Sequence, residues 1–95
     1  MLEFDVKVRS RRGLHARPAA QVVAMTSEFD SDVRLIYEDR NVDGKSILGL
    51  LVLAAPHGAN LRVQLDGPDE KNAGDRLQAL FDSLPTLTTA NLSAE

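Results

Sequence analysis

The chain has 95 residues and no cysteine, so its length suits one domain with its own hydrophobic core, and disulfide scaffolds, thiolate metal sites and thiol nucleophiles are excluded. Acidic residues outnumber basic ones by 14 to 11, giving a formal net charge of -3, which argues against nucleic-acid binding. The longest apolar stretch, Ile47 to Pro56, is too short to span a bilayer, and the first residues do not resemble a signal peptide. We therefore expect a cytoplasmic protein without membrane insertion, metal or cofactor.

The beginning of the chain predicts a strand followed by a helix. From Phe4 to Arg9, apolar residues alternate with charged ones, as in a strand with one buried face. The stretch from Ala16 to Ser27 predicts a helix, because Pro18 falls in its first turn, where a missing backbone N–H has little effect. The apolar stripe of this helix is predicted at Ala20, Val23 and Ala24.

The middle of the chain predicts two strands and a second helix. Alternation returns from Val33 to Tyr37, and a short strand is expected around Val42. Ser46 suits the N-cap of a helix that contains the apolar run Ile47 to Ala55. Two residues typical of helix ends follow this run, namely Pro56 and Gly58.

The last part predicts a strand from Leu61 to Leu65 and a helix whose apolar residues recur from Ala73 to Leu84, with Pro85 ending it. The order β-α-β-β-α-β-α, with one apolar face on each strand, predicts an α+β fold in which helices cover one side of an antiparallel sheet. We expect one domain over residues 1–88 and a frayed tail over residues 89–95.

The residues from Gly13 to Ala19 predict an anion site. His15 falls at the N-cap of the first predicted helix, where the backbone N–H groups of Ala16 and Arg17 and the helix dipole favour negative charge. The planar guanidinium of Arg17 suits phosphate oxygens. A neutral imidazole there could attack a phosphoryl group and release it again. The alternative is a histidine that only caps a helix.

The stretch from Lys7 to Arg17 carries basic residues and no acidic one. One interpretation is a solvated loop. The other is a basic surface beside a site that handles anions or meets an acidic partner. Composition does not separate the two.

Two motifs resemble those of the HPr family, the histidine-containing phosphocarrier proteins of the phosphoenolpyruvate-dependent phosphotransferase system. Gly13 to Ala19 resembles the active-site motif of that family, and Asp43 to Leu50 resembles its regulatory-serine motif. The separation of the motifs also matches, and the resemblance extends from Phe4 to about Leu84.

The resemblance implies an HPr-like open-faced sandwich, with a four-stranded antiparallel sheet and three helices on one face. It implies that enzyme I, charged by phosphoenolpyruvate, phosphorylates His15 on Nδ1, with Arg17 stabilising the phosphoryl group. His15 would then pass the group to an enzyme IIA-type domain, so the chain would be a stoichiometric intermediate rather than a stand-alone enzyme. The partner surface implied by the resemblance consists of Leu14, Ile47, Leu48 and Leu51.

The resemblance also implies regulation. Ser46 matches the serine that HPr kinase/phosphorylase modifies, and its alternative role is the helix cap alone. Arg12 stands where the family often has a small polar residue, while His57 is expected to be an ordinary surface residue. The context of Ser46 also suggests a second function, a regulatory binding module of a nitrogen-related branch whose phosphorylation state controls partner proteins. In either case we expect a monomer.

Overall fold

The elements of the fold occur in the predicted order. A computed structural model describes residues 1–87, so the predicted tail over residues 89–95 lies outside the described part. The helices and strands are β1 (Leu2–Lys7), α1 (Ala16–Thr26), β2 (Asp32–Tyr37), β3 (Arg40–Asp43), α2 (Ile47–Leu53), β4 (Asn60–Asp66) and α3 (Glu70–Leu87).

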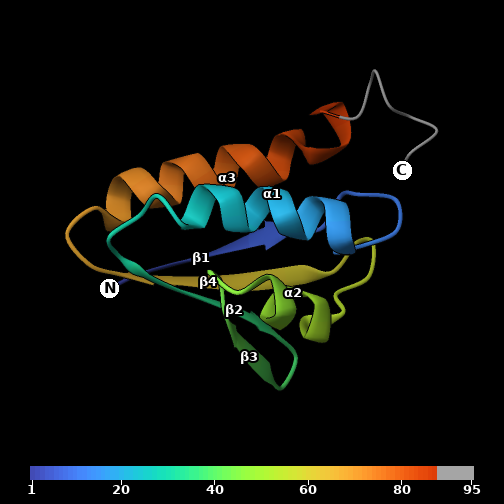
Figure 1. The fold of residues 1–95 in the computed structure, drawn as a ribbon, viewed down its shortest axis with the longest axis horizontal. Helices are drawn as coiled ribbons and strands as arrows, with labels where there is room; N and C mark the ends of the chain where they lie inside the picture. The colour runs from blue at the N-terminus through green and yellow to red at the C-terminus, as the bar shows by residue number, and fades with distance from the viewer. Residues whose placement is uncertain (88–95) are drawn as a thin grey trace.

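The four strands form one antiparallel sheet in the order β1-β4-β2-β3, which confirms the predicted α+β fold (Figure 1). A row of apolar residues crosses all four strands. Phe4 pairs with Val63, Val63 pairs with Leu35, and Leu35 pairs with Val42. Because side chains alternate along a strand, this register places the apolar residues of the four strands on the same face, except Ile36, which pairs with Arg62 on the other face.

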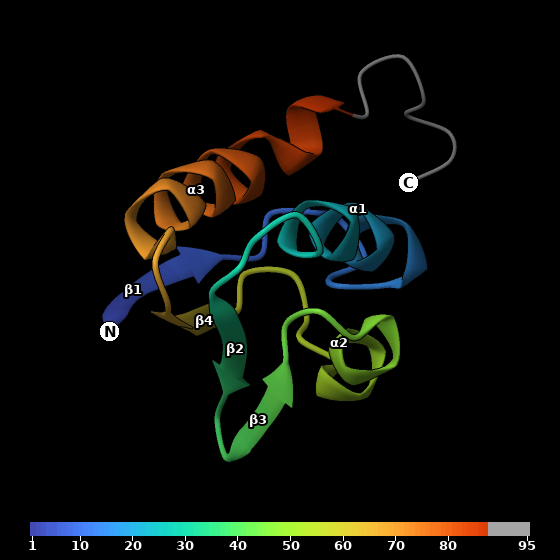
Figure 2. The same ribbon diagram turned by 60° about the vertical axis from the view of Figure 1, so that its left-hand side comes forward.

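The three helices cover that apolar face, with α1 between α2 and α3 (Figure 2). The last helix supplies the predicted buried side chains, namely Ala73, Leu77, Leu80, Phe81 and Leu84. The core therefore lies between the sheet and the helices, and α1 contacts both of the other helices.

The predicted apolar stripe of α1 was wrong by about one residue. Ala20 and Ala24 are exposed and Val23 is half-buried. The buried side is formed by Pro18, Ala19, Val22 and Thr26. Alanine is small enough to lie on either the buried or the exposed side of a helix. Thr26 can be buried because its hydroxyl donates a hydrogen bond to Gly44 O at 2.8 Å.

Two helix ends also differ from the prediction. The second helix stops at Leu53, because Ala54 takes a left-handed conformation with φ 54°, before Pro56 is reached. The last helix continues through Pro85 to Leu87. Pro85 removes one helical hydrogen bond, but only two helical residues follow it, and buried Leu84 keeps the preceding turn against the core.

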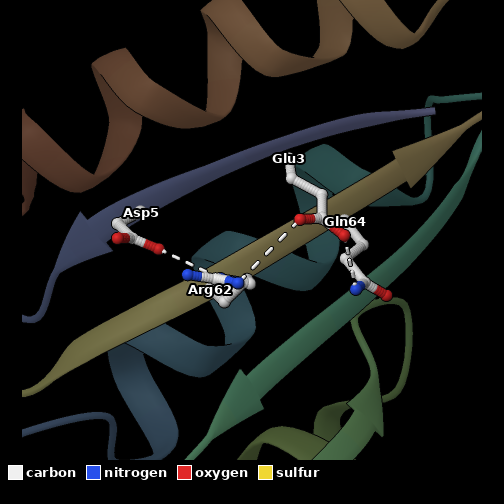
Figure 3. Close-up of polar contacts among 4 residues, drawn as sticks. All are labelled: Glu3, Asp5, Arg62 and Gln64. Atoms are coloured by element: carbon white, nitrogen blue, oxygen red, sulfur yellow. Dashed lines mark hydrogen bonds and ion pairs between the residues drawn. The ribbon is translucent and has the colours of Figure 1, made fainter.

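The other face of the sheet carries polar and charged side chains (Figure 3). Arg62 lies 3.5 Å from Asp5 and 3.9 Å from Glu3, measured between side-chain nitrogen and oxygen atoms. Gln64 donates a hydrogen bond to Glu3 at 2.8 Å. Such exposed pairs contribute little to stability, but their opposite charges largely neutralise one another across this face.

The start of α3 is joined to the start of β2 through Asp69. The carboxylate of Asp69 accepts hydrogen bonds from the Ser31 hydroxyl, from Asp30 N–H at 2.9 Å and from Ser31 N–H at 2.9 Å. The Ser31 hydroxyl, followed by the Asp30 N–H, lowers the pKa of the Asp69 carboxyl below its ordinary value of 3.8, because these donors favour the charged form.

We predict that Asp69→Asn lowers the melting temperature at pH 7. A lowered pKa in the folded state adds stability above the ordinary pKa of 3.8, and this stability is lost as the pH falls through the lowered pKa. The difference in melting temperature between the variant and the wild type should therefore become smaller as the pH falls below 3.8. Thermal unfolding across this range measures it, with the exposed Asp75→Asn in the same helix as control. A constant difference at all pH values would contradict the assigned role.

Candidate functional site

His15 occupies the predicted N-cap of α1. Its backbone is extended, with φ -91° and ψ -168°, and its carbonyl accepts the first helical hydrogen bond from Ala19 N–H at 2.9 Å. The imidazole makes no capping hydrogen bond to the helix, so the alternative of a histidine that serves only as a helix cap finds no support in the contacts. The residue is half-buried.

The first turn of α1 offers two backbone donors. Ala16 and Arg17 come before Ala19, the first residue whose N–H donates a helical hydrogen bond. Pro18, which lies between Arg17 and Ala19, has no N–H. Both Ala16 and Arg17 are exposed, and the first turn contains no acidic residue. The fold thus places His15 and two backbone N–H groups at the positive end of one helix dipole, with Arg17 exposed in the same turn, an arrangement suited to a phosphoryl group.

The loop before His15 is held tightly. Gly13 N–H donates to Ser10 O at 3.0 Å, and the Ser10 hydroxyl donates to Gly13 O. Gly13 has φ 77°, a conformation that glycine adopts without strain. Leu14 N–H donates to Ala55 O at 2.8 Å, which joins this loop to the chain that follows α2.

The joined loops approach too closely for a side chain at Gly13. A β-carbon added there would lie 2.5 Å from Ala55 O and 2.9 Å from Pro56 Cα. The same β-carbon would lie 3.1 Å from the backbone nitrogen of His57. The fold therefore places the backbone of the second histidine beside the site loop, which nothing in the local sequence around His57 indicated.

The other ends of α1 and α2 are joined as well. Thr26, at the C-terminal end of α1, donates to Gly44 O, and Lys45 Nζ donates to Phe29 O at 2.7 Å. The two helices are therefore antiparallel, with His15 near the end of α2 and Ser46 near the end of α1. At a rise of about 1.5 Å per residue, the 11 residues of α1 extend over roughly 16 Å and the 7 residues of α2 over roughly 10 Å.

Ser46 has the capping role that the sequence predicted. Its side-chain oxygen accepts a hydrogen bond from Gly49 N–H at 3.0 Å. Asp43 supports the same turn, because its carboxylate accepts from Lys45 N–H at 2.9 Å. Ser46 is half-buried, and the first exposed apolar residues of α2 follow it directly.

An apolar surface lies on α2. Ile47 is 43% exposed, Leu48 is 69% exposed and Leu51 is 38% exposed, as a docking surface requires. Val52, which the sequence did not single out, belongs to the same surface and is 62% exposed. Leu14 differs from the predicted set, because it is only 4% exposed and packs in the core, so it offers a partner almost no surface.

Neither metal-binding nor membrane-spanning features occur in the described part of the chain. Within residues 1–87, no three His, Asp or Glu side chains gather closely enough to hold a metal ion. No helix in that range combines the length and apolar character needed to cross a membrane.

Comparisons with known proteins agree on one family. The pattern of the family described as "PTS HPr component phosphorylation site" matches residues 2–83. The phosphocarrier protein HPr of Xylella fastidiosa (strain Temecula1) is 42% identical over 87% of this chain and 93% of its own length. The HPr of Treponema pallidum (strain Nichols) is 41% identical over 87% of this chain and 94% of its own. A crystal structure of HPr from Thermoanaerobacter tengcongensis superposes with a TM-score of 0.84 at 34% identity, covering 87% and 93% of the two chains.

We predict that Gly13→Ala destabilises the protein more than Gly58→Ala does. Both glycines have positive φ, 77° and 87°, so alanine costs about 1–2 kcal/mol at either position. A β-carbon at Gly58 meets nothing within 4 Å, whereas one at Gly13 overlaps Ala55 O. Forcing the loops apart should add about 1–3 kcal/mol for Gly13→Ala alone. Urea unfolding measures both variants, and equal losses would show that the close approach contributes nothing.

Proposed function

The chain belongs to the HPr family, the phosphocarrier proteins of the phosphotransferase system, and on that premise we propose that His15 carries the phosphoryl group. One observation supports this assignment above all. His15 lies at the end of α1 where the N–H groups of Ala16 and Arg17 precede the first helical hydrogen bond. An anion bound beside the imidazole would meet both donors and the positive end of the helix dipole.

In the proposed reaction, the Nδ1 lone pair of His15 attacks the phosphorus atom carried by enzyme I. The new N–P bond forms while the bond from phosphorus to the donor group of enzyme I breaks, and that group keeps the bonding electrons. Negative charge on the phosphoryl oxygens is met by the N–H groups of Ala16 and Arg17 and by the Arg17 guanidinium. Transfer to an enzyme IIA-type domain repeats the step, with the nitrogen of His15 as the leaving group.

The exposed apolar surface of α2, formed by Ile47, Leu48, Leu51 and Val52, is the proposed docking surface for enzyme I and the enzyme IIA-type domain. The loop after α2 is hydrogen-bonded to the loop before His15, so a partner bound to α2 would lie next to the N-terminal end of α1, where His15 is located. The chain would act as a monomeric, stoichiometric carrier. The relatives named above are phosphocarrier proteins, which favours this function over a nitrogen-related regulatory module.

Ser46 is the proposed regulatory position, modified by an HPr kinase/phosphorylase. The 7 residues of α2, about 10 Å of helix, lie between Ser46 and the chain that is hydrogen-bonded to the loop before His15. This length exceeds a Debye length of about 8 Å, so solvent ions screen much of the direct effect of a Ser46 phosphate on the imidazole. Ser46 is, however, adjacent in the chain to Ile47, at the edge of the docking surface. A phosphate would therefore act on partner association rather than on the transfer chemistry.

We predict that His15→Ala abolishes phosphorylation. Incubation with enzyme I and phosphoenolpyruvate should add the mass of one phosphoryl group to the wild type, and the bond should be labile in acid, as a phosphoramidate is. The variant should gain nothing, while His57→Ala should behave as the wild type and so serves as the matched control. Intact-mass measurement decides the matter, and a label of equal stoichiometry on His15→Ala would refute the assignment.

We predict that Ser46→Asp raises the apparent Michaelis constant for enzyme I several-fold at low salt. Aspartate keeps a good N-cap, so stability should stay close to that of the wild type, while the added charge repels an acidic partner. Salt should reduce the effect. Ser46→Ala is the control, because it loses about 1 kcal/mol of capping stability without adding charge. An unchanged Michaelis constant in Ser46→Asp and in protein phosphorylated on Ser46 would leave this residue as a cap alone.

A further inference from the structure

The turn before His15 presents two arginines to solvent. Ser10 to Gly13 forms a tight turn, closed by the hydrogen bond from Gly13 N–H to Ser10 O. Ser10 and Gly13, at its two ends, are buried, while Arg11 and Arg12, between them, are both exposed. A turn anchored at both ends holds the backbone of these two arginines in a defined place.

The neighbouring basic residue is directed elsewhere. Arg9 lies 3.8 Å from the carboxylate of Asp82 in α3, measured between Nη2 and Oδ1. Its charge is therefore partly balanced, whereas the stretch from Lys7 to Arg17 contains no acid that could balance Arg12 locally. Arg12 is also the arginine of the turn nearest in the chain to His15.

The backbone between Arg12 and His15 is short and bent. Three residues span at most about 11 Å when fully extended. Here the chain is more compact, because His15 N–H donates to Gly13 O at 3.0 Å in a two-residue bend. The separation between the two backbones is therefore within the combined length of an extended arginine side chain and an imidazole that carries a phosphoryl group.

We propose that Arg12 is a second phosphoryl-binding arginine, which acts with Arg17 on the group carried by His15. This inference rests on the proposed phosphocarrier role of His15. Arg17 approaches the phosphoryl group from the first turn of α1, and Arg12 approaches it from the turn before the helix. Two guanidinium groups on separate elements can contact different phosphoryl oxygens, and each adds a charge-assisted hydrogen bond.

Such a contact has a consequence that involves no partner protein. A guanidinium beside phosphohistidine favours the more negative state of the phosphoryl group and disfavours protonation of the ring, so it lowers the apparent pKa of the phosphorylated residue. Among residues 1–87, the charged or titratable residues on the elements that meet at this position include Arg11 in the same turn, His15 at the N-cap of α1, Arg17 in α1, and His57 in the loop after α2. Of these, Arg11 has the same charge as Arg12 and is likewise exposed, so it makes the matched control.

The test is a ³¹P NMR titration of the phosphorylated protein without enzyme I present. Arg12→Ser should raise the apparent pKa of the phosphorylated residue by about 0.5 or more, and Arg11→Ser should raise it clearly less. The series is repeated with His57→Gln in each protein, so that a charge change at this histidine is removed from the comparison. Circular dichroism spectra of the two serine variants should match that of the wild type, because both arginines are exposed.

Two results would overturn the proposal. The first is an equal apparent pKa of the phosphorylated residue in the wild type and in Arg12→Ser. If the Michaelis constant for enzyme I is raised at the same time, Arg12 belongs to partner docking. Equal changes in Arg11→Ser and Arg12→Ser would show a general effect of charge rather than a contact. Failure of the proposed function gives a different result, since the wild type itself would then take up no phosphoryl group on His15.

Discussion

The hydrogen bond from Leu14 N–H to Ala55 O is the constraint on which the arrangement of the site depends. It forms only because Gly13 allows the two loops to approach to a distance that a β-carbon would forbid. Through this contact, the residue before His15 is fixed to the end of the helix that carries the exposed apolar residues. The histidine and the proposed docking surface are consequently joined through the backbone, although they come from different helices.

The antiparallel packing of α1 and α2 divides this unit into two ends. At one end, the helix dipole and backbone donors surround His15. At the other end, Thr26 and Lys45 bind the backbone of the neighbouring element, and Ser46 caps α2. A charge added at the second end would therefore act on a partner bound to α2 more than on the imidazole. In the proposed function, this separation lets one small surface combine phosphoryl transfer with control of docking.

Charge is distributed unevenly over the fold. On the open face of the sheet, acids and bases from adjacent strands neutralise one another, as Arg62 does with Glu3 and Asp5. From Lys7 to Arg17 the chain carries basic residues and no acidic one, although the formal net charge is -3, and Arg9 of this stretch is paired with Asp82 of α3. Exposed basic residues such as Arg11 and Arg12 favour anionic groups and acidic surfaces, and this attraction acts mainly on the rate of association.

The sequence by itself determined the features that depend on local periodicity or on neighbours within one turn. These include the four strands, the positions of His15 and Ser46 at helix starts, and the α+β class. The tertiary structure alone decided that Leu14 is buried, that Val52 is exposed and that the backbone of His57 lies beside the site loop. It also set the buried side of α1, because alanines fit either side and Thr26 is buried only where Gly44 O accepts its hydrogen bond. These outcomes depend on how helices far apart in the chain pack together on the sheet, and no local pattern encodes the distance between them.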